Sequence, residues 1–355
     1  MGDVKVIGRY PILERKPTGL YSLDWCLGSR GEHGAPLRSL YEVYGYPNSG
    51  KSTLSYYLAG ALSPTPEITI CDLENLDVNY LKTAVGASVF TGEVHLVDSM
   101  TEDNKPRTHE TMLTELAVKL NNSSGSCILD SVGAIQSMVE QSVVNKEKES
   151  FGEAYMGKRA KLVAQMSRAL SGIVRIDPLP KTAFVINHVH QIMGSRGHAT
   201  AGGVVLTHMA AVRIMIWGKE QFTVSEEDPR PIGYLVEGKT EKLRFGGRGR
   251  TFSFYIVPGL GVHPGASAMF DCFDLGLAER KATIKMDGKS MGYLKKEFLD
   301  YAESGKVRKF DPFVEALQKY QETELKWGIE EKEENVIPTS KAGKGKAKVQ
   351  PPEPS

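Results

Sequence analysis

Residues 45–52 have the residue types and the spacing of a phosphate-binding loop. They read Gly-Tyr-Pro-Asn-Ser-Gly-Lys-Ser, which fits the pattern G-x-x-x-x-G-K-[ST]. The glycines let backbone N–H groups surround phosphate oxygens at a helix N-terminus. Lys51 is expected to reach the β- and γ-phosphates of a nucleoside triphosphate, and Ser52 to bind Mg²⁺ through its hydroxyl. An ordinary tight turn is the alternative, but an apolar run precedes this segment and a helical pattern follows it.

Two acidic positions would complete such a site. Asp130 ends a short apolar run at 127–129. A carboxylate at the carboxyl end of a neighbouring strand is where a phosphate-loop fold holds Mg²⁺, through water. Glu74 follows another apolar run, at 68–71, and would orient a water in line with the γ-phosphate. The alternative for Glu74 is a solvated loop carboxylate, and spacing alone does not choose between the two.

Apolar runs alternate with helical patterns through the first two thirds of the chain. Strands are expected at 40–44, 68–71, 94–97, 127–129, 183–186 and 212–217, and helices at 53–62, 111–120 and 160–174. This alternation predicts an α/β fold in which helices cover both faces of a mostly parallel central sheet. Two polar stretches, 136–152 and 190–203, interrupt the pattern, and loops of that length inside a compact domain are usually functional.

The composition limits the classes of function. The chain has 355 residues, 41% of them hydrophobic, so it can bury a full core and a wholly disordered chain is excluded. Its net charge is +1, so any affinity for nucleic acid must come from local basic patches. Cys26, Cys71, Cys127 and Cys272 form no CxxC pair or zinc-type cluster. There is no signal peptide and no apolar segment of ~18 residues, so the expected location is the cytoplasm, or the host cytoplasm for a viral source.

Several further segments match one known family in order and spacing. They are Pro17-Thr-Gly-Leu-Tyr-Ser-Leu-Asp24, Cys71-Asp-Leu-Glu-Asn-Leu-Asp-Val-Asn-Tyr80, Ile128-Leu-Asp-Ser-Val132, Tyr155-Met-Gly157, Ser167-Arg-Ala-Leu170, Ile186-Asn-His188, Ala201-Gly-Gly203 and Glu241-Lys-Leu-Arg244. Over roughly residues 17–300 the sequence resembles the RecA recombinase family, including its phage UvsX-type members. The resemblance implies a RecA-like P-loop ATPase core with a small C-terminal appendage.

The resemblance also implies roles around a bound ATP. Glu74 falls at the catalytic glutamate, and Asp77 and Tyr80 fall where adenine is contacted by a carboxylate and by a stacking ring. His188 ends the strand that senses the γ-phosphate. Bacterial members have glutamine there, and an imidazole can donate the same hydrogen bond. The expected ATP-binding residues are Gly45, Tyr46, Pro47, Asn48, Ser49, Gly50, Lys51, Ser52, Thr53, Asp77, Tyr80 and Asp130, with Ser52 and Asp130 toward Mg²⁺.

The two polar stretches are similar to the DNA-binding loops of the family, at roughly 135–156 and 190–204. Cations there would neutralise phosphates, glycines would admit the nucleic-acid backbone, and an apolar side chain would wedge between bases. The candidates for contact with single-stranded DNA are Met156, Gly157, Lys161, Arg168, Gly202 and Gly203, with Arg196 as an unaligned addition. For Lys161 and Arg168 the alternative is a solvated helix face.

Lys242 and Arg244 match basic residues that, in a family filament, reach the ATP of the neighbouring subunit. Such cations stabilise transition-state charge only after assembly, so hydrolysis would be coupled to polymerisation. On pattern alone this segment is an exposed strand.

The N-terminus departs from bacterial relatives, because the sixteen residues before Pro17 have no helical stripe, although 4–7 could form a docking strand.

Four segments are expected along the chain. These are a short N-terminal segment at 1–16, the ATPase core at 17–285, a small helical region at 286–330 and a disordered basic tail at 331–355.

The predicted function is an ATP-dependent DNA recombinase, that is, a DNA-dependent ATPase that forms a filament on single-stranded DNA and promotes pairing and strand exchange in recombination and repair. Expected partners are single- and double-stranded DNA, further copies of the chain, and mediator and single-strand-binding proteins, without a membrane. One alternative is a RecA-core ATPase that does not polymerise and acts as a regulatory or loading module. Another is a P-loop kinase for a small metabolite, although the sequence has no lid-like arginine cluster.

Overall fold

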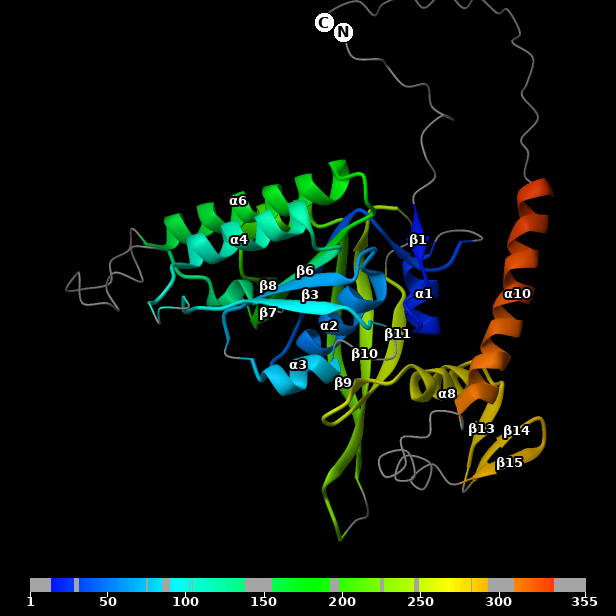
Figure 1. Cartoon of the computed structure of the whole chain (residues 1–355). Coiled ribbons are helices and arrows are strands. Elements are labelled where there is room, and N and C mark those ends of the chain that lie inside the picture. The colour runs from blue at the N-terminus through cyan, green and yellow to red at the C-terminus, as the bar shows by residue number, and fades with distance from the viewer. Residues whose placement is uncertain are drawn as a thin grey trace, which may run out of the picture.

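The structure of the chain is a computed structural model, shown in Figure 1. It describes residues 14–28, 32–74, 76–84, 90–101, 103, 105–137, 155–191, 198–223, 227–245, 249–281, 283–292 and 310–334. The expected docking strand at 4–7 and the expected tail beyond Glu334 lie outside these residues. The division into four segments therefore stays a prediction.

One ten-stranded sheet organises the described residues, in the order β12-β11-β10-β9-β3-β7-β6-β4-β5, with β8 paired to β7. Its strands are β3 (Ser39–Gly45), β4 (Glu67–Asp72), β5 (Glu93–Val97), β6 (Ser126–Asp130), β7 (Thr182–Gln191), β8 (His198–Thr200), β9 (Val212–Thr223), β10 (Pro231–Leu243), β11 (Thr251–Val257) and β12 (Gly261–Val262). Neighbours from β9 to β5 are parallel, and neighbours from β9 to β12 are antiparallel. The six expected strands are the six of the parallel half, and the predicted α/β fold is confirmed.

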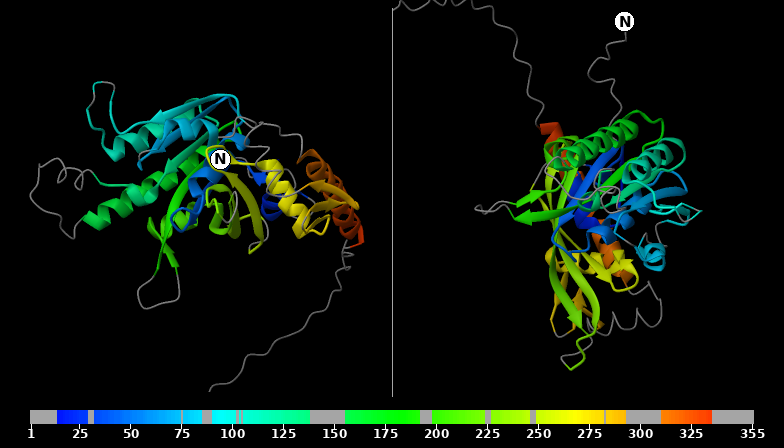
Figure 2. Two further views of the ribbon diagram at one scale, coloured as in Figure 1. Left: turned by 90° about the horizontal axis from the view of Figure 1, so that it is seen from below. Right: turned by 90° about the vertical axis from the view of Figure 1, so that its left-hand side faces the viewer.

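Helices cover both faces of the parallel half (Figure 1), as a second view also shows (Figure 2). The helices that pack on one face are α1 (Tyr21–Leu27), α2 (Lys51–Leu62) and α3 (Val78–Ala84). Those on the other face are α4 (His109–Asn122), α6 (Tyr155–Ile176) and α7 (Gly203–Met209). The three helices expected at 53–62, 111–120 and 160–174 are α2, α4 and α6.

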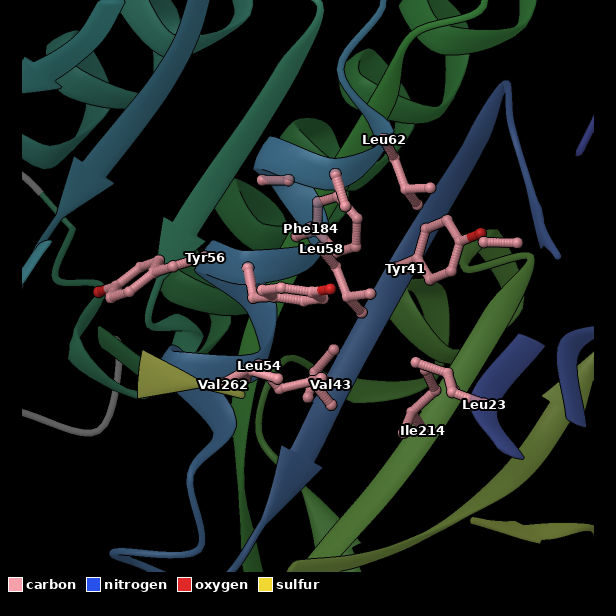
Figure 3. Packing of buried hydrophobic residues seen from close by; sticks show 14 of the residues in the cluster. Leu23, Tyr41, Val43, Leu54, Tyr56, Leu58, Leu62, Phe184, Ile214 and Val262 are labelled. Carbon is pink, nitrogen blue, oxygen red and sulfur yellow. The ribbon is translucent and has the colours of Figure 1, made fainter. Parts of the chain in front are cut away.

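The two cores follow from the two-residue period of the strands. In β7, Phe184 and Ile186 belong to the cluster around α2, whereas Ala183 and Val185 belong to the cluster around α4 and α6. Successive side chains of a strand point to opposite faces, so a strand covered on both sides is apolar throughout. Figure 3 shows Leu54, Leu58 and Leu62 of α2 packed with Tyr41 and Phe184, whose ring centroids lie 4.9 Å apart.

A third cluster joins the C-terminal elements to the antiparallel half of the sheet. These elements are α8 (Pro264–Asp274), the small sheet of β13 (Ala278–Arg280), β14 (Ile284–Met286) and β15 (Lys289–Gly292), and α10 (Asp311–Glu334). Arg280 pairs with Glu220 of β9 at 2.9 Å and lies over the ring of Phe222, which fastens the small sheet to the large one. Within 286–330, where a small helical region is expected, the described residues contain the strand β15 as well as the helix α10.

Two further short elements precede or follow the main strands, namely the ribbon of β1 (Arg15–Lys16) with β2 (Ala35–Pro36), and a 3-10 turn at Val132–Ala134. All four cysteines are buried and free, as their apolar surroundings predict for Cys71 and Cys127. Among the described helices, none is both long and apolar enough to cross a membrane.

Truncation of Phe184 tests the packing between α2 and the sheet. Phe184 is fully buried and stacked on Tyr41, so Phe184→Ala should lower the free energy of unfolding by about 3–5 kcal/mol. Urea denaturation followed by circular dichroism measures the change. Ile176→Ala is the control, because Ile176 is 81% exposed and its truncation should change stability by less than about 0.5 kcal/mol. Equal effects of the two substitutions would contradict the described packing.

Candidate nucleotide site and nucleic-acid face

The loop at 45–52 connects β3 to α2 and has the left-handed backbone that its sequence predicts. Gly50 has φ +86° and Asn48 has φ +58°. At Gly45 a Cβ atom would lie 2.2 Å from the carbonyl oxygen of Ile216, so the neighbouring strand excludes any side chain there. The Lys51 ammonium donates to the carbonyl oxygen of Tyr46 at 2.6 Å, which folds the lysine back over the loop. The N-terminal N–H groups of α2 are therefore open to an anion.

A cavity of about 920 Å³ opens in front of this loop. One wall consists of residues 47–53, and another of segments of β9, β10 and β11 with the turn that follows β11. The remaining lining residues include Asp130 at the end of β6, Glu74 after β4, His188 within β7 and Tyr80 on α3. The volume lies at the upper end of the range of small-molecule sites, and a nucleoside triphosphate fits within it. Most of the residues predicted to bind ATP thus line one cavity.

Asp130 lies at the buried floor of the cavity, beside the N-terminus of α2. The Tyr56 hydroxyl donates to its Oδ2 at 2.6 Å, and Ser52 is also hydrogen-bonded to the carboxylate. Burial raises the pKa of Asp130, and the two hydrogen bonds oppose that rise. One hydroxyl and one carboxylate fit Mg²⁺, which takes few protein ligands and fills the rest with phosphate and water. Within the described ranges no group of three or more His, Cys, Asp or Glu forms a metal cage.

Glu74 and His188 come together at the edge of the cavity. The Ser131 hydroxyl donates to Glu74 Oε1, and His188 Nε2 lies 3.2 Å from the same oxygen. Glu74 remains 42% exposed, so its carboxylate can reach a water in the cavity. His188 is therefore in direct contact with the expected catalytic acid.

Lys51 shares this charge environment. Burial lowers the pKa of the Lys51 ammonium, and the carboxylates of Asp130 and Glu74 act in the opposite direction. The Lys51 ammonium is thus stabilised by the carboxylates of Asp130 and Glu74, in the part of the cavity where phosphate groups are expected to bind.

Asn187, next to His188, links the site to the second polar stretch. Its Nδ2 donates to Glu42 Oε1 at 2.8 Å and to the carbonyl oxygen of Ala201 at 2.7 Å. Glu42 is fully buried in β3 and is paired with Arg213 of β9, with Nε donating to Oε2 at 2.5 Å. These hydrogen bonds connect strands β3, β7 and β9 with Ala201, which directly precedes Gly202.

The two residues expected at the adenine are placed differently. Tyr80 lines the cavity, and its hydroxyl is hydrogen-bonded to Thr53. Asp77 does not line the cavity. Its Oδ1 accepts from the Asn79 N–H at 2.8 Å, so in the single chain its carboxylate caps the start of α3.

Lys242 and Arg244 lie far from the phosphate loop of their own chain. Lys242 is level with Arg213 of β9, whereas Gly45 at the start of the loop is level with Ile216. Lys242 donates to the carbonyl oxygens of Thr207 and His208, and Arg244 donates to that of His208, at the C-terminus of α7. Neither cation is among the described residues that line the cavity of its own chain.

The described DNA-binding candidates lie on α6 and at the start of α7. Gly157, Lys161 and Arg168 are exposed and lie 4 and 7 residues apart, so they share one face of α6. Gly202 packs against this helix, since a Cβ there would lie 2.9 Å from Val163 Cγ1, whereas a Cβ at Gly203 would meet open space. Of Met156 the structure describes only the backbone, in the first turn of α6, and Arg196 lies outside the described residues, as do 138–154 and 192–197 of the two loops.

Sequence reasoning missed two kinds of residue at the site. One is the wall formed by β9, β10 and β11, which carries no motif. The other is the set of side chains that hold the functional groups, namely Tyr56, Ser131, Glu42 and Arg213. For Tyr56 a signal existed, because a tyrosine in an apolar helix needs a partner for its hydroxyl, and four residues after Ser52 it lies on the same side of α2.

Comparison with known proteins agrees with this geometry. The family model described as RecA N-terminal domain matches residues 8–262. The chain belongs to the RecA family. It is 26% identical over 285 residues to Protein RecA of Ruminococcus albus, covering 79% of this chain and 65% of that protein. It is 27% identical over 251 residues to Protein RecA of Campylobacter jejuni, covering 69% and 66%, so the chain spans about two thirds of the length of these RecA relatives.

Substitution of Tyr56 tests whether its hydroxyl prepares Asp130 for a cation. In this RecA-family chain, Tyr56→Phe removes a hydrogen bond that orients the Asp130 carboxylate and opposes the rise in its pKa, so a proton competes more strongly with the cation. We expect the affinity for Mg²⁺, measured by calorimetry in the presence of a non-hydrolysable ATP analogue, to fall roughly five-fold or more. Tyr57→Phe is the matched control, because the Tyr57 hydroxyl donates to the carbonyl oxygen of Thr18 instead. If both substitutions weaken Mg²⁺ binding equally, the Tyr56 contact has no specific role.

Proposed function

We propose that this RecA-family protein is an ATP-dependent DNA recombinase, which binds single-stranded DNA as a filament and promotes homologous pairing and strand exchange. The observation that carries the proposal is the hydrogen-bonded connection from the ATP cavity, through Asn187, to Ala201 beside Gly202. A P-loop enzyme that modifies a small metabolite has no need of such a connection to an outer loop. Family membership gives the coarse assignment to recombination, and the activity itself is our inference.

In the proposed reaction, water attacks the γ-phosphate and ATP becomes ADP and phosphate. The N-terminus of α2 and Lys51 bind the phosphates, and Glu74 orients the attacking water and accepts its proton. Ser52 and Asp130 would hold Mg²⁺, which when bound offsets the charge of the β- and γ-phosphates. His188 fixes Glu74 through their contact, so the geometry of the acid depends on the end of β7.

Loss of the γ-phosphate would alter β7 at Asn187 and His188, where the strand leaves its pairing with β3, and with it the second polar stretch. His188 contacts Glu74 in the cavity, and its neighbour Asn187 bonds to Ala201. A displacement of this strand end therefore acts directly on the backbone that leads to Gly202. The exposed face of α6 that carries Lys161 and Arg168 would bind phosphates of single-stranded DNA, and Gly202 meets the same helix on its buried side, at Val163.

The distance of Lys242 and Arg244 from their own cavity supports a site shared between subunits. Two cations that do not line the cavity of their own chain would be available to the phosphates of the next chain in a head-to-tail assembly. Hydrolysis would then require contact between copies, and DNA would promote it by aligning them.

ATP hydrolysis with and without single-stranded DNA tests the proposal. Turnover should rise with DNA, and should rise cooperatively with protein concentration because the active site forms between copies. Lys51→Ala should reduce the rate roughly 10²–10³-fold by removing a phosphate-binding cation. Turnover that is independent of DNA and of concentration would instead support the alternative, a RecA-core ATPase that does not polymerise.

Mixing two inactive variants tests the shared site more sharply. Arg244→Ala should lose roughly 10³-fold or more in rate, as for an arginine supplied by a neighbour, and Lys51→Ala should be inactive through its own cavity. In an equal mixture, about a quarter of the interfaces join an intact cavity to an intact Arg244, so activity should return to that fraction. A mixture as inactive as its two components would show that Arg244 does not act between subunits.

A further inference from the structure

A second cavity, of about 280 Å³, lies away from the phosphate loop among α1, β10, β11, α8 and α10. Figure 1 shows α1 next to β11, with α10 along the same side of the molecule. Tyr21 of α1 and Tyr320 of α10 meet edge to face at 6.5 Å, and Trp25 and Leu275 are among the exposed large hydrophobic residues. The cavity is too small for a nucleotide and has the size of one long side chain.

The lining of this cavity combines carboxylates with aromatic rings. Glu237, Asp271 and Asp274 line it, and none of the described residues that line it is a lysine or an arginine. Asp271 is only 3% exposed and accepts the Ser22 N–H at 3.1 Å, but no ion pair is formed with it within the described part of the chain. A buried carboxylate without a counter-cation is costly, and entry of a cation would offset that cost.

The surroundings agree with a site for a cation. Burial raises the pKa of Asp271 to about 7, and the charges of Asp274 and Asp24 act in the same direction. The aromatic walls attract cations by their ring faces, and Trp25 already carries the Arg250 guanidinium 4.7 Å from its ring centroid. An ammonium group on an apolar stem matches both the rings and the acids.

We propose that this cavity binds a lysine side chain from the chain's own C-terminal segment, residues 335–355. That segment contains Lys341, Lys344, Lys346 and Lys348 against one acidic residue, Glu353. It follows directly on α10, which supplies one wall of the cavity through Tyr320. The acids of the cavity and the lysines of the segment are complementary in charge.

The length of the chain allows this contact. Fourteen helical residues separate Tyr320 from Glu334, which is about 21 Å at 1.5 Å per residue. The seven residues from 335 to Lys341 span at most about 24 Å when extended. Lys341 can therefore just return to the level of Tyr320, and the three lysines beyond it reach the cavity with length to spare. The contact does not depend on the proposed ATPase or recombinase activity.

Proteolysis of the full chain by a lysine-specific protease tests the contact. A lysine held in the cavity is protected, so one of the four sites at 341–348 should be cut more slowly than the others in the unaltered protein, and roughly five-fold faster in Asp271→Asn/Asp274→Asn. Glu279→Gln is the matched control, since Glu279 is an exposed acid on β13 away from the cavity, and it should be cut at the unaltered rate. Equal rates in all three proteins overturn the proposal.

Carbodiimide cross-linking identifies the occupant. In an equimolar mixture of ¹⁵N-labelled and unlabelled full-length protein, we expect links from the lysines at 341–348 to Glu237 or Asp274 within one isotopic form. Links of mixed isotopic composition would place a second copy in the cavity and would overturn the assignment to the chain's own segment. Links from those lysines only to acids outside the cavity would overturn it as well. Circular dichroism of the Asp271→Asn/Asp274→Asn variant checks that the fold is retained, and Asp274→Asn alone, whose substituted residue is exposed, should show faster cleavage as well.

Discussion

The alignment of parallel strand ends at one edge of the sheet is the constraint on which the site depends. The register of β3 with β7 places Gly45 beside His188, and that of β4 with β6 places Asp72 beside Asp130. Residues far apart in sequence therefore meet at the same edge of the sheet, where β3, β4 and β6 end. The phosphate loop, the buried acid and Glu74 then meet without any long connection. Because the two faces of these strands pack into different cores, a shift of register by one residue would move side chains from one core into the other and disrupt the packing of both.

A buried charge in the middle of that sheet couples the edge to the outer loops. Glu42 has no solvent exposure, so it must be compensated, and Arg213 and Asn187 provide this. Removal of one partner from a buried pair typically costs about 3–5 kcal/mol, so the three side chains form one unit. Since Asn187 also holds Ala201, the same interaction that stabilises the sheet fixes the start of the segment around Gly202.

What the sequence could predict was what is encoded locally. The phosphate loop is a contiguous motif, and the strands of the parallel half are apolar runs because both faces are covered. Most of β10 was not predicted because one of its faces is only partly buried. Buried and partly buried residues therefore alternate along it, as at Gly233, Tyr234 and Leu235, and no continuous apolar run marks the strand. Tyr56 and Arg213 act through partners distant in sequence, and no local pattern reports such contacts. The short strands β13–β15 were missed because three residues are too few for a periodic signal.

The position of Lys242 and Arg244 has an energetic consequence for the proposed shared site. In the single chain both cations donate to the carbonyl oxygens that end α7. Such contacts at a helix C-terminus contribute about 0.3–1 kcal/mol each, whereas an arginine that stabilises transferring phosphate contributes roughly 10³–10⁵ in rate. The cations can therefore leave α7 at small cost when a neighbour's phosphates are present. Because α7 begins at Gly203, that departure would loosen the far end of the helix that starts beside the proposed DNA-binding glycines.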